Sequence, residues 1–148
     1  LTAKADWAFA KWEPPQDAAY DAVSKSKLGQ RTTPTWWMSE FEVAEIPSHP
    51  VLLDLSGMTK GQVYLNGHNV GRYFVAEADG SAVKPGGHVW IPSVWLTEGL
   101  NTLTLFDEHG GNPGKAKLVV DADRSPSAAG PAADSLGADD RRPRPLSR

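Results

Sequence analysis

The sequence predicts an all-β fold, an antiparallel jelly-roll β-sandwich, on three observations. About seven short apolar runs are separated by turn residues roughly every eight to twelve positions, which is typical of sandwich proteins. The dipeptide Asn66-Gly67, which readily forms a type I′ turn, lies between two of these runs. No stretch has a long helical period, so a parallel α/β fold, which needs crossover helices, is excluded.

The region before the first clear strand carries weaker signals. Residues 1–12 contain aromatic side chains and are followed by Pro14-Pro15, which stops any regular element. We expect an edge strand or an extended segment over 1–12. The small and polar residues of 17–23 predict one or two helical turns.

Two strands are predicted ahead of the Asn66-Gly67 turn. Residues 36–43 alternate, so that Trp37, Phe41 and Val43 share a buried face and the glutamates between them share the other face. Residues 51–55 form the second apolar run, which ends at a Ser-Gly turn. Both runs have the length of ordinary strands.

The hairpin itself joins residues 63–65 to residues 70–74. If Asn66 and Gly67 form a two-residue loop, the opposed pairs are Leu65 with His68, Tyr64 with Asn69, and Val63 with Val70. Val63, Leu65 and Val70 then share the face that points into the core.

Arg72 fits this register poorly. It would lie on the core side, where an unpaired charge costs several kcal/mol. We therefore expect either that the strand bends away before Arg72 or that Arg72 reaches a partner at the rim. The same register places Tyr64, Asn69 and Tyr73 on the outer face of the hairpin.

The remaining elements follow in order. Residues 77–87 predict a surface loop, 88–92 a short edge strand that ends at a proline, and 93–96 one helical turn. Residues 100–106 alternate Leu and Thr, so Leu103 and Leu105 should face inward and Thr102 and Thr104 outward. Residues 116–121 form the last predicted strand.

The chain is expected to hold one folded domain. Its 148 residues can bury a sizeable core, and we assign residues 1–122 to the sandwich. Residues 123–148 lack aromatic side chains and are rich in Ala, Pro, Ser, Asp and Arg. Such a segment buries too little apolar surface to order itself, so a disordered low-complexity tail is predicted.

Composition excludes several function classes. The net charge of −3 provides no basic face for nucleic acid, and no run of apolar residues is long enough to span a membrane. The first residues do not have the pattern of a signal peptide, and from the abrupt start we expect the chain to be a piece excised from a longer protein. It contains no cysteine, which excludes disulfides, thiolate zinc sites and cysteine nucleophiles.

No catalytic constellation is evident. Asp107 and Glu108 are adjacent and should point to opposite faces of a strand, so they are a poor acid/base pair for glycoside hydrolysis. The histidines are scattered and lack the spacing of a zinc motif; they are His49, His68, His88 and His109. A structural Ca²⁺ is common in sandwiches of this kind, but its oxygen ligands cannot be assembled from the sequence.

Aromatic side chains are the remaining chemical signal. A sugar ring presents an apolar C–H face and a fringe of hydroxyls, so sugar sites pair a stacking aromatic ring with polar donors and acceptors. Trp36 and Trp90 lie on short strands and could be either core or platform. The candidate carbohydrate-binding residues are Trp36, Tyr64, Asn66, His68, Asn69, Arg72 and Tyr73.

An ordered set of motifs from Trp36 to Pro113 resembles the C-terminal jelly-roll domains of family 35 β-galactosidases. The motifs are Leu53-Asp54-Leu55, Gly57-Met58-Thr59-Lys60-Gly61-Gln62, Leu65-Asn66-Gly67, Gly71-Arg72-Tyr73, Pro92-Ser93-Val94-Trp95-Leu96, and Asn101 through Phe106 to Glu108-His109-Gly110-Gly111-Asn112-Pro113. Phe74 stands where the family has Trp, and the loop 74–87 is shorter than the Cys-containing insertion of plant members.

The resemblance implies a galactose-binding-like sandwich that accompanies a catalytic barrel in a secreted or cell-envelope glycoside hydrolase. The family's catalytic acid and nucleophile lie in that barrel, so none is expected here. The leading hypothesis is a non-catalytic, monomeric carbohydrate-binding module for galactosides or galactan, extracellular or periplasmic, with the parent catalytic domain as its other partner. The alternative is a structural accessory domain that packs on the barrel and binds no sugar.

Overall fold

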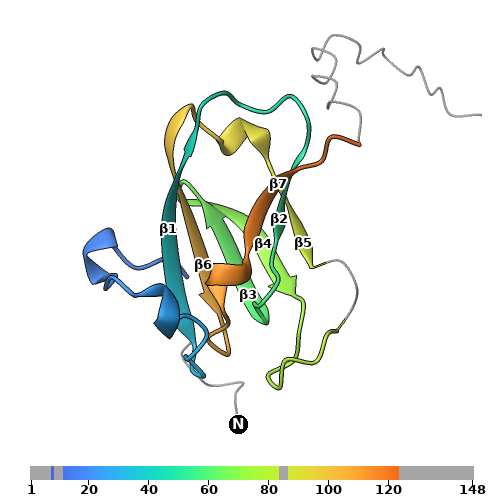
Figure 1. Cartoon of the computed structure of the whole chain (residues 1–148). Coiled ribbons are helices and arrows are strands. Elements are labelled where there is room, and N and C mark those ends of the chain that lie inside the picture. Colours follow the sequence, from blue (N-terminus) through green and yellow to red (C-terminus); the bar gives the residue numbers. More distant parts are fainter. Residues whose placement is uncertain (1–7, 9–11, 84–86, 124–148) are drawn as a thin grey trace, which may run out of the picture.

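The computed structural model describes residues 8, 12–83 and 87–123, which form two antiparallel sheets packed face to face (Figure 1). The strands are β1 (Thr35–Val43), β2 (Val51–Asp54), β3 (Lys60–Leu65), β4 (His68–Phe74), β5 (His88–Ile91), β6 (Gly99–Asp107) and β7 (Lys117–Val120). Short 3₁₀ turns are η2 (Asp17–Ala19), η3 (Lys25–Lys27), η4 (Ser93–Trp95) and η5 (Pro113–Lys115). The predicted antiparallel β-sandwich is confirmed.

The larger sheet has the order β1-β6-β3-β4 and the smaller sheet the order β5-β2-β7. The segment before β1 lies outside the sandwich on the β1 side, drawn in blue (Figure 1). The predicted strand or extended segment over 1–12 falls outside the described residues, apart from Ala8 and Trp12. The predicted tail likewise falls outside them, apart from Asp123.

The core lies between the two sheets. Each sheet supplies fully buried aliphatic side chains: β2 provides Leu53, and β3 provides Val63 and Leu65, all at most 1% exposed. Trp37 is buried, and Phe41 and Val43 pack on the same cluster, as the alternation of β1 predicts. Leu103 and Leu105 of β6 also face inward as predicted, whereas Leu100 is exposed.

The hairpin prediction is correct for the turn and for the first two residue pairs, and wrong from the third pair onward. Asn66 and Gly67 have φ angles of +48° and +80°, and Leu65 pairs with His68 and Tyr64 with Asn69. Val63, however, pairs with Gly71 rather than with Val70, because a β-bulge interrupts the ladder between Val63 and Tyr64.

The bulge reverses the predicted faces of the residues beyond it. Arg72 pairs with Gln62 on the outer face, and its side chain is 75% exposed. Tyr73 pairs with Gly61, points into the sandwich and is only 5% exposed. The prediction that Arg72 faces the core and Tyr73 faces solvent is therefore wrong.

Gly71 allows the bulge to form without backbone strain. Its φ angle of +143° lies where a side chain would be strained, and an isolated glycine within a strand pattern often marks a bulge. The extra residue moves the charged guanidinium out of the core. A regular ladder without this extra residue would place the charge of Arg72 on the core side.

Candidate functional site

The outer face of the four-stranded sheet, which points away from the smaller sheet, carries a group of rings that we call the outer aromatic cluster. It consists of Trp12, Trp36, Tyr64 and Phe106. Adjacent strands supply three of the rings: Trp36 from β1 pairs with Phe106 from β6, and Tyr64 from β3 lies on the other side of β6. Ring centroids within the cluster are 5.0 to 5.8 Å apart.

Trp12 lies on top of this cluster and arrives from outside the sheet. Its ring stacks on Trp36 at 5.6 Å with an interplanar angle of 25°, and meets Phe106 edge-on at 5.2 Å. Nevertheless 57% of Trp12 is exposed. An indole held by its neighbours on one side and open on the other is a ready platform for a flat apolar surface.

A first groove, the Arg72 groove, lies beside Trp12 with a volume of about 350 Å³. Its lining residues are Trp12, Gly61, Gln62, Arg72, Phe106 and Glu108. Glu108 binds Lys60 at 3.1 Å and Arg72 at 3.6 Å, so a carboxylate, a guanidinium and an amide surround the rings. These groups can donate to and accept from hydroxyls in several directions.

A second groove, the hairpin-tip groove, continues from Trp12 toward the turn, with a volume of about 600 Å³. The segment 12–17 forms one wall, and Tyr64, Gly67, His68 and Asn69 form part of the other. The His68 ring is fixed by stacking on Trp95 at 5.0 Å and 12°. The threonines Thr102 and Thr104 of β6 line the groove between the walls.

Asn66, predicted as a site residue at the tip, is fully engaged inside the protein. Its Nδ2 donates to the Trp95 carbonyl and to Asn101 Oδ1, both at 2.8 Å, and its Oδ1 accepts from the Thr102 backbone N–H at 2.8 Å. Asn101 is 1% exposed. Asn66 therefore joins the hairpin to the η4 and β6 region and faces no groove.

Tyr73, another predicted site residue, belongs to a buried polar group around Asp107. Its hydroxyl donates to Asp107 Oδ2 at 2.9 Å and to the Phe106 carbonyl at 2.8 Å. Burial raises the pKa of the Tyr73 hydroxyl well above its ordinary value, and the nearby Asp107 carboxylate acts in the same direction. Tyr73 thus stays a neutral donor and is not accessible to a ligand.

Asp107 serves the fold. It is 0% exposed and accepts hydrogen bonds from the Thr59 N–H at 2.7 Å, the Thr59 hydroxyl at 2.6 Å and the His109 N–H at 2.9 Å. Glu108, the next residue, faces outward to Lys60 and Arg72. The two carboxylates lie on opposite sides of the strand, as predicted, so they do not flank a common substrate.

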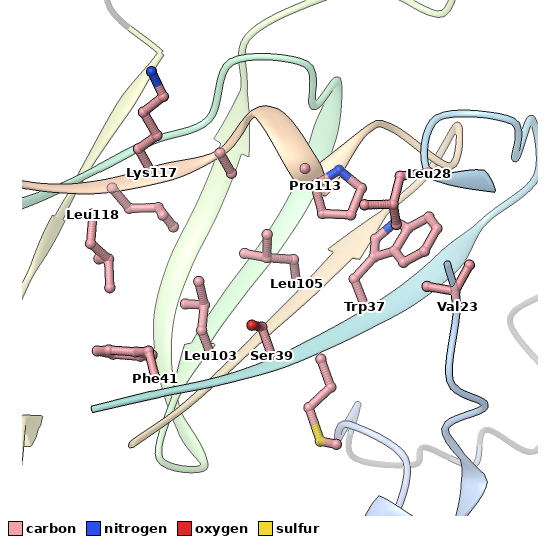
Figure 2. Close-up of a pocket in the computed structure, with 14 residues that line it drawn as sticks. Val23, Leu28, Trp37, Ser39, Phe41, Leu103, Leu105, Pro113, Lys117 and Leu118 are labelled. Atoms are coloured by element: carbon pink, nitrogen blue, oxygen red, sulfur yellow. The ribbon is translucent and has the colours of Figure 1, made fainter. Parts of the chain in front are cut away.

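A third hollow opens between the sheets beside β1 and β7 and has a volume of about 400 Å³ (Figure 2). Its walls are mostly apolar, with Trp37, Phe41, Leu105 and Leu118 among the lining residues. The Trp37 indole N–H already donates to the Gly110 carbonyl at 2.6 Å. This hollow has few polar groups to offer a sugar.

Of the predicted site residues, the structure brings Trp36, Tyr64, His68, Asn69 and Arg72 to the outer face or its grooves. It does not bring Asn66 or Tyr73 there. Sequence reasoning missed Trp12, Gln62, Phe106 and Glu108. The available signal for Trp12 is its position directly before the Glu13-Pro14-Pro15 stretch, because consecutive prolines hold a neighbouring ring in an extended, exposed segment.

Within 8, 12–83 and 87–123, no group of three or more His, Asp or Glu side chains is placed to hold a metal ion. Across that same part of the chain, no helix is long and apolar enough to cross a membrane.

Comparison with known proteins gives a consistent result. Residues 34–101 match the family model described as the galactose-binding domain of beta-galactosidase. Beta-galactosidase 8 of Arabidopsis thaliana is 30% identical over 113 residues, which cover 62% of this chain and 13% of that protein. Beta-galactosidase 12 of Oryza sativa subsp. japonica is 35% identical over 81 residues, which cover 54% of this chain and 9% of that protein. The chain thus spans only a small part of these relatives.

Proposed function

We propose that the chain is a non-catalytic carbohydrate-binding module that binds galactosides, because residues 34–101 match the family model described as the galactose-binding domain of beta-galactosidase. The binding surface is the outer aromatic cluster with its two grooves. Trp12 is the stacking platform, and Arg72, Glu108 and Gln62 are the nearest polar partners.

The single observation that carries this proposal is that the Trp12 ring is held in place by stacking and is still largely exposed. A large ring that is stacked on Trp36 yet 57% exposed leaves apolar surface in water, beside charged groups. Galactose has an axial 4-hydroxyl, so one face of its ring is a continuous patch of C–H groups that can stack on an indole. The hydroxyls at the edge of the sugar then reach charge-assisted hydrogen-bond partners.

Isothermal titration of the 148-residue chain with galactose and lactose tests the proposal. We expect binding that Trp12→Ala weakens about tenfold and Trp12→Phe weakens less, because a stacked ring contributes roughly 0.5 to 1.5 kcal/mol beyond its area. Trp90→Ala, on the far sheet, is the matched control and should bind as the parent chain does. Absence of binding at millimolar sugar with an intact melting transition would refute the proposal.

A specific observation favours a second candidate, a structural accessory domain that packs against another domain of its parent enzyme. On the outer face of the smaller sheet, Leu52 lies between Trp90 and Val119, which are 45% and 42% exposed. Such an apolar row suits protein contact better than sugar contact. If this candidate alone is correct, Trp90→Ala weakens association with the catalytic domain and no sugar binds.

We also propose that the chain is an accessory domain of a parent glycoside hydrolase, whose catalytic domain lies outside this chain. We place this enzyme in an extracellular or periplasmic location and expect the present chain to be a monomer of 16.0 kDa. Sedimentation velocity checks the monomer, and detection of the parent enzyme in the medium or periplasmic extract of its source cells checks the location.

A further inference from the structure

We infer that the Arg72 groove and the hairpin-tip groove are two subsites of one continuous groove, which accommodates a linear β-galacto-oligosaccharide rather than a single terminal galactose. This inference rests on the proposed function. It goes further because it specifies the length of the ligand and assigns a role to a groove on either side of Trp12.

The residues that line the two grooves follow one another along the strands. Phe106 of β6 and Glu108, which directly follows β6, line the Arg72 groove, and Thr104 and Thr102 of β6 line the hairpin-tip groove. On β3, Gln62 lines the first groove and Tyr64 the second. The grooves therefore follow each other in the strand direction on one face of the sheet.

Trp12 lines both grooves. Its ring contacts Phe106, which pairs with Gln62, and stacks on Trp36, whose ring lies 5.8 Å from that of Tyr64, so it can stack on a central sugar of a longer chain. The two neighbouring sugars would then extend into the groove on either side. A site for a single terminal sugar needs only one of these grooves.

Length supports the same conclusion. At about 3.3 Å per residue, the stretch from Thr102 on β6 to Glu108 just after it spans about 20 Å, which exceeds the length of one pyranose ring. The groove volumes, about 350 and 600 Å³, each fall in the range of sites that hold a small molecule. The hairpin-tip groove also offers hydroxyl, amide and imidazole groups from Thr102, Asn69 and His68.

The two subsites differ in chemistry, and this difference makes them separable. The Arg72 groove is charged, with the Arg72 and Glu108 ion pair at 3.6 Å. The hairpin-tip groove has no Lys or Arg among its described lining residues; it carries the carboxylates of Glu13 and Asp17 on one wall and the amide of Asn69, which is exposed on β4, on the other. Removing one polar side chain from each groove should therefore affect oligosaccharides of different length differently.

The test is a chain-length series measured by isothermal titration with the 148-residue chain. The ligands are galactose and β-1,4-linked galactobiose, galactotriose and galactotetraose, with cellotetraose as the stereochemical control. We expect affinity to rise at least about tenfold from galactose to galactotetraose, the equivalent of about 1.4 kcal/mol of added contact. Cellotetraose, whose 4-oxygens are equatorial rather than axial, should bind more weakly than galactotetraose.

Two single substitutions, one in each groove, test whether both grooves bind sugar. Arg72→Ala should weaken galactose and galactotetraose by similar factors. Asn69→Ala should weaken galactotetraose by a larger factor than galactose, which flattens the chain-length series. Glu45→Ala, an exposed position in the turn after β1, is the control and should leave the series unchanged.

The outcomes separate this inference from the proposed function. Equal affinity for galactose and galactotetraose means that one subsite binds sugar, so the extended groove is refuted while the module remains. A rising series that Asn69→Ala does not flatten also refutes the hairpin-tip subsite. Failure of all the sugars to bind a folded chain refutes both.

Discussion

The two faces of the four-stranded sheet are built from the same strands and serve different purposes. On β3, Val63 and Leu65 are 0% exposed on the inner face, whereas Gln62 and Tyr64 point to the outer face and line grooves. The smaller sheet covers the inner face, apart from the hollow that opens between the sheets beside β1 and β7. The outer face is covered only in part, by Trp12 and the segment that follows it.

The difference between the two faces shows that one strand can carry core side chains and groove-lining side chains at alternate positions. Alternate residues of a strand point to opposite faces, so a change at one position has little effect on the neighbour's environment. The inner residues each contribute about 1.5 to 3 kcal/mol of burial. The outer residues are free to present rings and charges, and substitutions on the two faces should have separable effects.

The largest expected effect is at the buried end of the sheet. Asp107→Ala should lower the free energy of unfolding by about 3 to 5 kcal/mol, because it leaves the Thr59, Tyr73 and His109 donors buried without their acceptor. Urea denaturation measures the loss. Glu108→Gln, one residue away on the outer face, should cost less than about 1 kcal/mol. Similar losses for both variants would contradict the division between the faces.

A smaller effect is expected at the hairpin tip. Asn66→Ala should destabilise the chain by about 2 to 3 kcal/mol, because three hydrogen bonds to Trp95, Asn101 and Thr102 disappear. Thermal or urea unfolding measures this loss, and His68→Ala at the same tip is the comparison. If Asn66→Ala instead left stability intact and abolished sugar binding, Asn66 itself would belong to the recognition surface, contrary to its structural role.

The third prediction concerns Arg72, which the predicted register places on the core side and the structure places on the outer face. Arg72→Ala should change the free energy of unfolding by less than about 1 kcal/mol, because its side chain is 75% exposed and its ion pair with Glu108 is screened by solvent. Urea denaturation checks this value. A loss of several kcal/mol would mean that the guanidinium is buried and that the bulge is absent.

The smallest effect is on the outer face of the other sheet. Hydrogen bonds from the Ser56 hydroxyl and N–H hold the pKa of Asp54 below its ordinary value. A lowered pKa stabilises the fold above the unfolded pKa, and this stability is lost as the pH falls through the folded pKa. Ser56→Ala should therefore cost less than about 1 kcal/mol at pH 7 and nothing once Asp54 is protonated. Urea denaturation at several pH values tests it, and a cost that persists in acid would contradict this cause.

Most of the fold is predictable from local patterns. Alternation in 36–43 and 100–106, with the Asn66-Gly67 turn, places β1, β6 and the hairpin correctly. The pairing beyond Asn69 is not predictable from the turn alone, because an extra residue at a bulge shifts every later side chain to the other face. Gly71, isolated within a strand, is the available signal.

The candidate site is less predictable because long-range packing assembles it. Trp12 is far in sequence from the strands it covers, and no periodicity connects it to Trp36 or Phe106. The roles of Asn66 and Tyr73 depend on Asn101 and Asp107, distant partners that no local pattern identifies. The sequence therefore indicates a polar and aromatic outer face but not which of its groups remain accessible.

The most direct test of the central claim is a ¹⁵N NMR titration of the tryptophan indole N–H groups with galactotetraose. The chain has six Trp residues, and their signals can be assigned by single Trp→Phe substitutions. We expect the Trp12 signal to shift most, and the signals of buried Trp37 and of Trp90 on the opposite sheet to stay in place. A shift confined to Trp90, or no shift of any indole at millimolar sugar, would contradict recognition by the outer face of the four-stranded sheet.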